Sequence, residues 1–476
     1  MKNRIKRILA LFFVLLLPML SACGSAGEIR ATESYISTEN QAWSFGFGRR
    51  QILPDPESDE PLYIAGYNTA AEIEGVLDYC EARAIWIDAG GEGVLLIGVD
   101  CVALDSGVVG QIREKLKDIE NCASVHVYST HTHAGADTLG LWGPTAVDGK
   151  NSAYMESLIE AAAEAGREAA ENSTAGKLYY GYVETDAEEM LRDSRIPMVF
   201  DAKLHQLRFE AEDSSAGLRM YFYCAHAESL RSVNRKLSRD YPGILCDTVT
   251  EKTGDNTMFL PGAVGGLLMT KEFVPTDTQA DAEENLHITG EKIVSYALSI
   301  SEETERELAP TLAFARTVFT VPLDNTGFQL FRFLGILSNK AVRGQSATGY
   351  LVETELSVLQ LGDLALALIP GEIFPELVYG GVYGDANPNG VNPQPLCEIA
   401  SEFGFDTLLV VGLANDELGY IVPPSDFLLN KNMPYIEKTM DYKGENHYEE
   451  TNSVGLDCAD AIAAALRAAF EAVSEK

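Results

Sequence analysis

The chain has 476 residues, of which 46% are hydrophobic, and its 36 basic and 71 acidic residues give a formal net charge of −35. A chain of this length and hydrophobicity buries a large core, in one large domain or in two. The acidity argues against nucleic acid as a partner and against electrostatic adhesion to an anionic membrane surface.

The first 22 residues have the layout of an export signal. Four Lys and Arg residues precede an apolar run over residues 8–20, which is too short to span a bilayer comfortably. The run ends in Leu20-Ser21-Ala22-Cys23, which resembles the lipobox of bacterial lipoproteins. We therefore expect a lipoprotein signal over residues 1–22 and an extracytoplasmic protein that a lipidated Cys23 anchors to the bacterial cell membrane. The alternatives are an ordinary cleaved signal or an uncleaved anchor.

The segment that follows the signal is predicted to be a tether and an N-terminal loop over residues 23–60. Residues 24–40 are polar, and residues 45–61 are rich in Gly, Pro and Asp, which favours loop structure. Without Cys23 the chain keeps seven cysteines, an odd number with no Cys-x-x-Cys pair. We expect them to be buried apolar residues rather than a disulfide or zinc framework.

Hydrophobic periodicity predicts a mixed α/β (α+β) fold for the rest of the chain. Strands are predicted at residues 82–87, 94–104, 125–128, 178–183, 204–209, 218–224, 312–321, 354–361, 364–369 and 407–413. Helices are predicted at residues 106–121, 152–170, 293–308 and 459–473, the second of them capped by Asn151. No internal repeat or linker divides this region, so we expect central mixed β-sheets flanked by helices in a single domain over residues 61–476.

Residues 125–137 are VHVYSTHTHAGAD, and the polar turn within them, residues 129–133, carries two of the seven histidines of the chain. In an extended segment, residues two apart project to the same side, so His131 and His133 can face one cavity. The alternative is a pair of surface or core histidines without a ligand. The strand–helix–strand pattern over residues 94–128 is a crossover unit, which places both histidines just past the carboxyl end of a strand. Open α/β sheets bind their ligands at such ends.

Three further apolar strands end in a polar turn. His226 ends the run over residues 220–226, Glu372 follows Pro370-Gly371, and Tyr420 follows the buried strand at residues 407–413. Two or three nitrogen ligands and a carboxylate at strand ends suit a zinc ion that keeps one position open for water. Each residue alone also has a structural explanation, as a strand cap, a solvated carboxylate or a packed aromatic ring.

These segments together resemble the neutral (non-lysosomal) ceramidases, zinc amidohydrolases that cleave the N-acyl bond of ceramide. The order of the motifs carries the resemblance, and no single motif is specific. The matching segments are Gly66-Tyr67, Ala82-Arg83-Ala84, Ser129-Thr130-His131-Thr132-His133, Ala225-His226, Pro370-Gly371-Glu372 and residues 412–420. The resemblance implies that residues 61–476 form a ceramidase-like catalytic domain.

The resemblance also implies roles for individual residues. It implies a zinc ion held by His131, His226, Glu372 and Tyr420. His133 would face the substrate carbonyl rather than the metal. Arg195, in a segment similar to the Asn-Arg-Ser-Pro stretch of the family, and Tyr448, in a segment similar to its Arg-Tyr-Glu stretch, would be substrate contacts.

The sequence departs from the family in two ways. The Gly-Asp-x-Ser-Pro segment of the family aligns with residues 265–269, where Gly266 and Leu268 replace the acid and the hydroxyl. The sequence stops after the segments that resemble the catalytic domain, so we expect the C-terminal immunoglobulin-like domain of the family to be absent. The leading hypothesis is a zinc-dependent amidohydrolase that acts on the N-acyl amide of a ceramide-like lipid or a related acyl compound. The alternatives are a non-catalytic metal- or ligand-binding surface lipoprotein with the same fold and an esterase.

Overall fold

The structure, a computed structural model, describes residues 28–37, 41–192, 195, 199–213, 215–266, 268–381, 391–441, 444 and 446–474. The predicted signal and Cys23 lie outside the described residues. Within these ranges, no helix is both long and apolar enough to cross a membrane.

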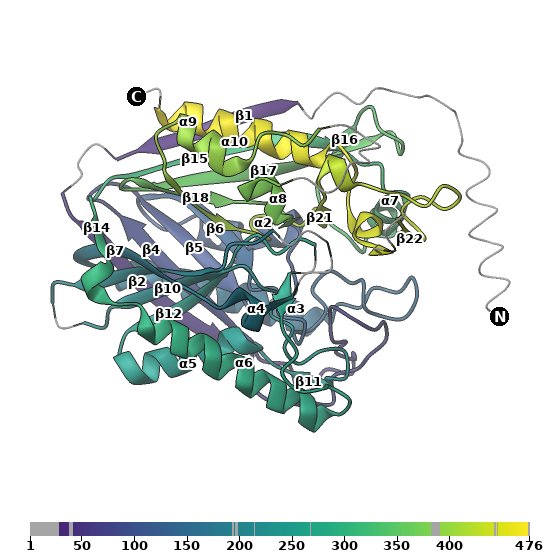
Figure 1. The fold of residues 1–476 in the computed structure, drawn as a ribbon, viewed down its shortest axis with the longest axis horizontal. Coiled ribbons are helices and arrows are strands. Elements are labelled where there is room, and N and C mark those ends of the chain that lie inside the picture. Colours follow the sequence, from purple (N-terminus) through teal and green to yellow (C-terminus); the bar gives the residue numbers. More distant parts are fainter. Residues whose placement is uncertain are drawn as a thin grey trace.

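Two large mixed sheets form the centre of the molecule (Figure 1). The nine-stranded sheet has the order β12 (Asn256–Pro261), β10 (Leu218–Tyr223), β9 (Lys203–Ala211), β7 (Thr174–Glu184), β2 (Trp43–Gln51), β4 (Glu81–Asp88), β5 (Gly93–Val99) and β6 (Cys122–Ser129), with β14 (Arg306–Leu308) beside β7. The six-stranded sheet has the order β1 (Ile29–Ile36), β15 (Leu312–Pro322), β17 (Tyr350–Leu361), β18 (Leu364–Leu368) and β20 (Thr407–Val411), with β16 (Ala341–Arg343) beside β17.

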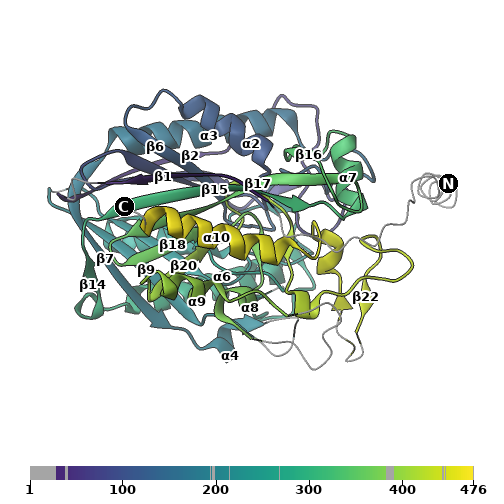
Figure 2. The ribbon, with the colours of Figure 1, turned by 90° about the horizontal axis from the view of Figure 1, so that it is seen from above.

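Helices cover the outer faces of both sheets, so the fold has helical layers outside a sheet-on-sheet core (Figures 1 and 2). Alternate side chains of a strand point to opposite faces of the sheet. In β4, Ile85 and Ile87 face the core between the sheets, whereas Ala84 and Trp86 face the helices. The nine-stranded sheet is covered by α2 (Ser106–Leu116), α3 (Ser152–Glu171), α5 (Tyr241–Thr253) and α6 (Gln279–Ser299). The six-stranded sheet is covered by α9 (Leu396–Glu402) and α10 (Cys458–Ser474).

Short elements complete the described structure. They are β3 (Gly75–Val76), α4 (Ala187–Met190), β8 (Leu191–Arg192), β11 (Lys236–Leu237), β13 (Met269–Thr270), η1 (Glu302–Thr304), α7 (Thr326–Phe333), β19 (Glu372–Ile373), α8 (Pro375–Tyr379), β21 (Tyr420–Ile421), η2 (Pro424–Asp426), β22 (Thr439–Met440), β23 (Asn446–His447) and η3 (Glu449–Asn452). Two of them, β19 and β21, carry the predicted site residues Glu372 and Tyr420.

The predicted mixed α/β fold is confirmed, with central sheets and flanking helices. The helix predicted at residues 152–170 is α3, and Asn151 caps it by accepting a 2.8 Å hydrogen bond from the Tyr154 N–H. The helix predicted at residues 106–121 ends earlier, as α2, and the described cysteines are all free.

Three of the secondary-structure predictions are wrong. The loop predicted at residues 45–61 contains most of β2, because Trp43 and Phe45 alternate into the core between the sheets. The tether predicted at residues 24–40 contains β1, which pairs antiparallel with β15 along its whole length. The helix predicted at residues 293–308 is the end of α6, which stops at Ser299, and its last residues form β14, which pairs with β7. In each case pairing with a distant strand outweighed the local pattern.

Candidate metal centre

The carboxyl ends of four strands meet at one edge of the two sheets. β6 and β10 belong to the nine-stranded sheet, and β18 and β20 belong to the six-stranded sheet. Two backbone hydrogen bonds join the sheets there, from Ser129 N–H to the Leu413 carbonyl at 3.1 Å and from Asn415 N–H to the Val127 carbonyl at 2.6 Å. The turns that follow these strands are therefore held against one another.

The turn after β6 aims both predicted histidines into the protein. His131 has a left-handed φ of 64° and lies 3% exposed, and its Nδ1 is 2.7 Å from the Val102 carbonyl. Its Nε2 lies 3.3 Å from Nε2 of His133. The His133 backbone N–H donates to the Ala227 carbonyl at 3.0 Å, which brings the turn beside the segment that carries His226.

His226 lies after β10 and is fully buried. The Leu268 carbonyl accepts two hydrogen bonds from it, one from the backbone N–H at 2.9 Å and one from ring Nδ1 at 2.8 Å. A carbonyl can only accept, so Nδ1 of both His131 and His226 carries a proton, and in the neutral ring each Nε2 then presents a lone pair. This is the arrangement that orients histidine ligands in metal sites.

Glu372, in β19, completes the cluster from the other sheet. Its Oε2 lies 3.0 Å from Nε2 of His226 and 3.3 Å from Nε2 of His131. Burial opposes ionisation of this carboxyl group, but the two imidazoles outweigh it and hold the pKa of Glu372 well below its usual range. The same contact raises the pKa of His226 against the effect of its burial.

The spacing of these atoms fits a small divalent cation. Nε2 of the three histidines lie in a group whose ligand atoms are all within 4.8 Å of one another. Tetrahedral ligands at the usual zinc distances lie about 3.3 Å apart, close to the separations of 3.0 and 3.3 Å around Glu372. Imidazole nitrogens with a carboxylate oxygen form a ligand set that suits zinc. By spacing alone, His133 belongs to this group as much as His131 and His226 do.

Tyr420 lies beside Glu372 because β21 pairs in parallel with β19, with these two residues in register. Its hydroxyl lies 2.8 Å from that of Tyr448, so two of the predicted site residues touch each other. Burial and the Glu372 carboxylate both raise the pKa of Tyr420 well above its usual value. A phenolate therefore forms at this position only next to a cation.

Two residues behind His133 were not predicted to belong to the site. The Glu228 carboxylate accepts a hydrogen bond from the Tyr67 hydroxyl, and its Oε2 lies 3.6 Å from Nδ1 of His133. Burial and the neighbouring imidazoles of His131 and His226 hold the pKa of His133 well below its usual range. Glu228 lies two residues after His226, so the alternation rule that pairs His131 with His133 also indicates it.

Arg195 is fully buried in an ion-pair cluster of its own chain. Its Nη1 lies 2.5 Å from Asp426 Oδ2, and its Nη2 lies 2.8 Å from Glu449 Oε2 and 3.4 Å from Glu450 Oε2. Glu449 and Glu450 begin η3 immediately after Tyr448. The cluster therefore connects Arg195 to the backbone that carries Tyr448.

The segment that departs from the ceramidase motif keeps its backbone contacts. Leu268 buries its side chain, while its carbonyl orients His226. Gly265 N–H donates to the Ile373 carbonyl at 2.9 Å, which ties the segment to β19. The loss of the acid and the hydroxyl at Gly266 and Leu268 therefore removes side-chain chemistry, and the frame around the histidines remains.

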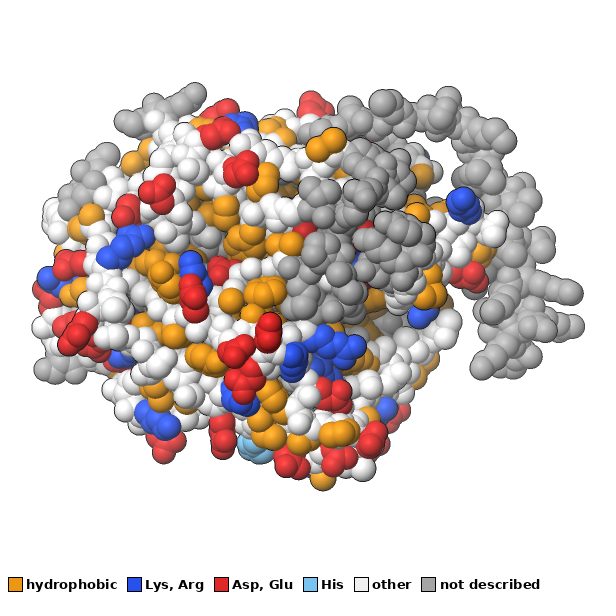
Figure 3. Space-filling model, in the orientation of Figure 1, with side chains coloured by type: hydrophobic (Ala, Val, Ile, Leu, Met, Phe, Trp, Pro, Cys, Tyr) orange, Lys and Arg blue, Asp and Glu red, His pale blue; other side chains and the backbone are white. Residues whose placement is uncertain are grey.

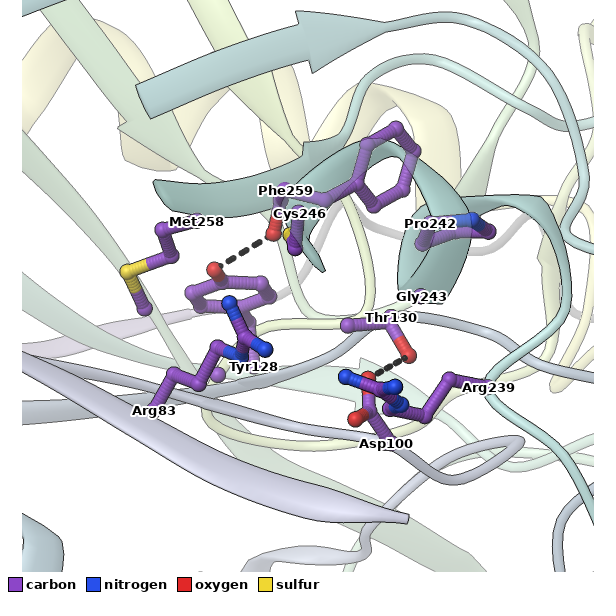
Figure 4. A pocket seen from close by; sticks show the side chains of 11 residues that line it. Arg83, Asp100, Tyr128, Thr130, Arg239, Pro242, Gly243, Cys246, Met258 and Phe259 are labelled. Atoms are coloured by element: carbon purple, nitrogen blue, oxygen red, sulfur yellow. Dashed lines mark hydrogen bonds between the residues drawn. The ribbon is translucent and has the colours of Figure 1, made fainter. Parts of the chain in front are cut away.

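A separate small pocket is lined by residues that include Thr130, which precedes His131 (Figure 4). Arg83, Asp100 and Arg239 line it, and the Asp100 carboxylate accepts a 3.0 Å hydrogen bond from the Thr130 hydroxyl. Burial raises the pKa of Asp100 to about 6. This cluster supports the residue that precedes His131 and is distinct from the histidine centre.

Two solved structures that this chain matches are described as ceramidases. It superposes on the neutral ceramidase from Pseudomonas aeruginosa with a TM-score of 0.67 and 15% identity, over 91% of this chain and 75% of that chain. A structure described as ceramidase complexed with C2 matches with a TM-score of 0.66 and 14% identity, over 91% and 76% of the two chains. The fold is ceramidase-like. No protein-family model and no curated protein sequence matches the chain.

Proposed function

We propose that this protein is a zinc-dependent amidohydrolase that cleaves the N-acyl amide of a ceramide-like lipid or a related acyl compound. The observation that carries the proposal is the convergence of the Nε2 atoms of His131 and His226 on the Glu372 carboxylate, at 3.3 and 3.0 Å, with both rings oriented through Nδ1. The ceramidase-like fold supports the substrate class, although fold alone does not fix function.

In this proposal the zinc ligands are His131, His226, Glu372 and Tyr420. Zinc supplies Lewis acidity there: it polarises a substrate carbonyl and lowers the pKa of water to about 7. The Val102 and Leu268 carbonyls hold the two imidazoles in the tautomer that binds a metal. Tyr420 lies in register with Glu372, and a cation stabilises its phenolate.

His133 is the proposed donor to the substrate oxygen. Nε2 of His133 lies 3.3 Å from Nε2 of His131, so a proton on this nitrogen would place an N–H donor beside the proposed metal ligand. That N–H is the group that would stabilise negative charge on the carbonyl oxygen during amide cleavage. Glu228, held by Tyr67, lies on the other side of the ring, with its Oε2 3.6 Å from Nδ1 of His133.

Tyr448 and Arg195 have different proposed roles. Tyr448 is the second substrate contact, because its hydroxyl touches that of Tyr420 beside the centre. The contacts of Arg195 with Glu449 and Asp426 support a positioning role, in which it holds the segment that carries Tyr448. A direct contact between Arg195 and the substrate stays a prediction.

The segment at Gly266 and Leu268 supports a substrate that differs from ceramide itself. A leucine cannot form the hydrogen bond that a serine makes to a hydroxyl or a water, so we propose that ceramide is a poor or altered substrate. The same loss favours the alternative, a surface lipoprotein that binds a metal or ligand without catalysis. We further propose that the lipidated Cys23 anchors the protein outside the cytoplasm.

Metal analysis combined with a hydrolysis screen tests the function. The purified chain is expected to contain about one zinc ion and to release fatty acid from at least one N-acyl amide in a panel that includes ceramide. His131→Ala is expected to lose both metal and activity. His287→Ala, on the exposed surface of α6, is the matched control and is expected to keep both. Zinc-loaded protein that releases no fatty acid but binds an N-acyl amide would favour the binding lipoprotein.

A further inference from the structure

Helix α7 is apolar but has no buried side chain. It contains Phe328, Leu330, Phe331 and Phe333 within eight residues, and none of its residues is buried. The Phe333 ring is 83% exposed, and Leu334, which follows the helix, is 48% exposed. Phe328 and Phe331 pack partly against the core, whereas Leu330, Phe333 and Leu334 are exposed close together in the sequence. Grouped exposed apolar side chains are typical of a surface that contacts an apolar partner. We name Leu330, Phe333 and Leu334 the α7 surface.

The charge around α7 differs from that of the rest of the chain. Acidic and basic side chains are interspersed over the face shown in Figure 3. Residues 325–352, in contrast, include Arg332, Lys340 and Arg343 but no Asp or Glu, in a chain with 71 acidic residues. Lys340 pairs with Glu353, so Arg332 and Arg343 are the basic side chains of this segment that can meet an anionic headgroup.

Helix α7 lies beside the elements that carry the candidate site. Asn325, its N-cap, donates a 2.9 Å hydrogen bond to the Ser453 carbonyl, just after η3. A Cβ atom on Gly419, the residue before Tyr420, would lie 3.4 Å from the Phe328 ring. A molecule that contacts the α7 surface therefore approaches the Tyr420 side of the centre.

The first described residue lies at the same end of the sheet. The Glu28 carbonyl accepts a 3.1 Å hydrogen bond from Thr320 N–H, near the end of β15, and β15 leads into α7 four residues after Pro322. Five peptide units from Glu28 to Cys23 span at most about 18 Å. A lipid anchor on Cys23 would thus hold the bilayer within reach of α7.

Other exposed apolar side chains lie at this end. Val147 is 55% exposed, in a loop whose Lys150 ammonium donates to the Ile336 carbonyl at 2.5 Å, just after α7. β22, with Met440 63% exposed, lies at the same end of the molecule as α7 (Figures 1 and 2). Large apolar side chains are also exposed elsewhere in the described residues, among them Leu53, Tyr182 and Val391, but α7 and the residue after it expose three within five positions. The longer helix α6 exposes only Leu298 among its large apolar residues.

We propose that the α7 surface inserts into the interfacial region of a lipid bilayer and turns the Tyr420 side of the centre towards the membrane. Phe333 and Leu334 enter the headgroup–acyl boundary, where aromatic and aliphatic side chains gain most from leaving water. Arg332 and Arg343 lie among the phosphate groups. The proposal concerns binding and orientation, so it does not depend on which bond the centre cleaves.

Depth-dependent fluorescence quenching tests this orientation on the full chain. Phe333→Trp is mixed with phosphatidylcholine vesicles, either plain or carrying bromine on the acyl chains, and Leu298→Trp on α6 is the matched control. Trp43 and Trp86 are buried and Trp142 is half-buried, so the unmodified chain supplies the baseline. Because a lipid anchor brings both variants to the vesicle equally, the comparison reports orientation and not attachment.

For Phe333→Trp, the tryptophan emission is expected to shift to shorter wavelength on plain vesicles and to be quenched on brominated vesicles. Leu298→Trp is expected to show neither change. Arg332→Glu added to Phe333→Trp is expected to weaken the effect most on vesicles that contain phosphatidylglycerol. Equal quenching at both positions, or none at Phe333, would overturn the proposal. A shift that grows with protein concentration without vesicles would assign the α7 surface to a second copy of the chain and would also overturn it.

Discussion

Oε2 of Glu372 lies 3.0 Å from Nε2 of His226, although the two residues are 146 positions apart and follow strands of different sheets. The contact exists because the carboxyl ends of β10 and β18 meet at one edge, and because the Leu268 carbonyl turns the imidazole towards the carboxylate. Both partners are buried, so the contact is strong only while the glutamate keeps its charge.

Glu372→Gln is expected to weaken zinc binding by at least about 100-fold. The amide keeps the shape of the side chain but removes the negative charge that draws a cation between the imidazoles. Competition with a zinc-binding dye measures the affinity. Glu398→Gln, on the exposed side of α9, is the control and is expected to bind zinc unchanged. Equal zinc affinity in both variants would exclude Glu372 as a ligand.

His133→Ala is expected to keep its zinc and to lose activity by about 10²–10³-fold, because a donor to the developing oxyanion is removed. Zinc content and the rate of fatty-acid release from an N-acyl amide, measured on the same preparation, separate the two effects. If His133→Ala loses zinc as His131→Ala does, His133 is a ligand in a three-histidine centre, which the spacing of the Nε2 atoms also permits.

Gly66→Ala is expected to displace the His133 ring. Gly66 has a left-handed φ of 101°, and a Cβ atom there would lie 2.5 Å from Nδ1 of His133. Gly254→Ala is the matched control, because Gly254 also has a positive φ, 82°, but has open space around its missing Cβ. Both variants lose about 1 kcal/mol to backbone strain, and only Gly66→Ala is expected to lose activity. Chemical denaturation and the rate of hydrolysis measure the two effects.

The free energy of unfolding is expected to depend on pH through Asp416. Burial raises the pKa of this carboxyl group to about 6. In the unfolded chain this carboxyl group has a pKa of about 3.9 and has released its proton by pH 5, whereas the native state still holds the proton. The contribution of Asp416 to the free energy of unfolding therefore falls as the pH rises from 4 to 6. Its full contribution is present only below pH 4.

Asp416→Asn removes this dependence. The amide oxygen keeps the acceptor that takes hydrogen bonds from Ser106 N–H at 2.7 Å and the Asn339 side chain at 2.6 Å. Between pH 4 and pH 7, the free energy of unfolding of Asp416→Asn is expected to rise by about 3 kcal/mol relative to that of the wild type. This value follows from the difference of about two pKa units between the native and the unfolded state. Denaturant titrations at both pH values measure the gain, and parallel pH profiles for the two proteins would contradict it.

Cys23→Ala is expected to prevent lipidation and to release the protein from the membrane or leave the precursor uncleaved. Mass spectrometry of the N-terminal peptide and fractionation of cells measure both outcomes. Cys122→Ala, at a half-buried cysteine far along the chain, is the control and is expected to remain anchored. A processed and lipidated Cys23→Ala protein would contradict the lipobox prediction.

The convergence of His131, His226 and Glu372 was predictable because each follows a strongly apolar strand, and strand ends collect at a sheet edge. The long inner strands were predictable for the same reason. β1 was not, because its residues are polar and exposed and only the pairing with β15 defines it. The end of α6 was missed because the pattern of apolar residues continues past Ser299 into β14.

Some contacts of the site could not be predicted from the sequence. The support of Glu228 and Tyr67 for His133 joins residues 161 positions apart, a relationship that no local pattern contains. Arg195 was predicted from a motif as a substrate contact, but burial among Asp426, Glu449 and Glu450 is a property of tertiary packing. Charge pairs of this kind become visible only when the chain is folded.

The main-chain oxygen of Leu268 has a consequence for how such proteins diverge. It fixes both the amide and the ring of His226, and every amino acid supplies that oxygen. Selection can therefore exchange the side chain at this position, and with it the chemistry offered to a substrate, while the geometry of the imidazole is inherited unchanged. Substrate preference and metal affinity are thus separable traits in this architecture, and a motif search that demands the serine would overlook proteins that retain the centre.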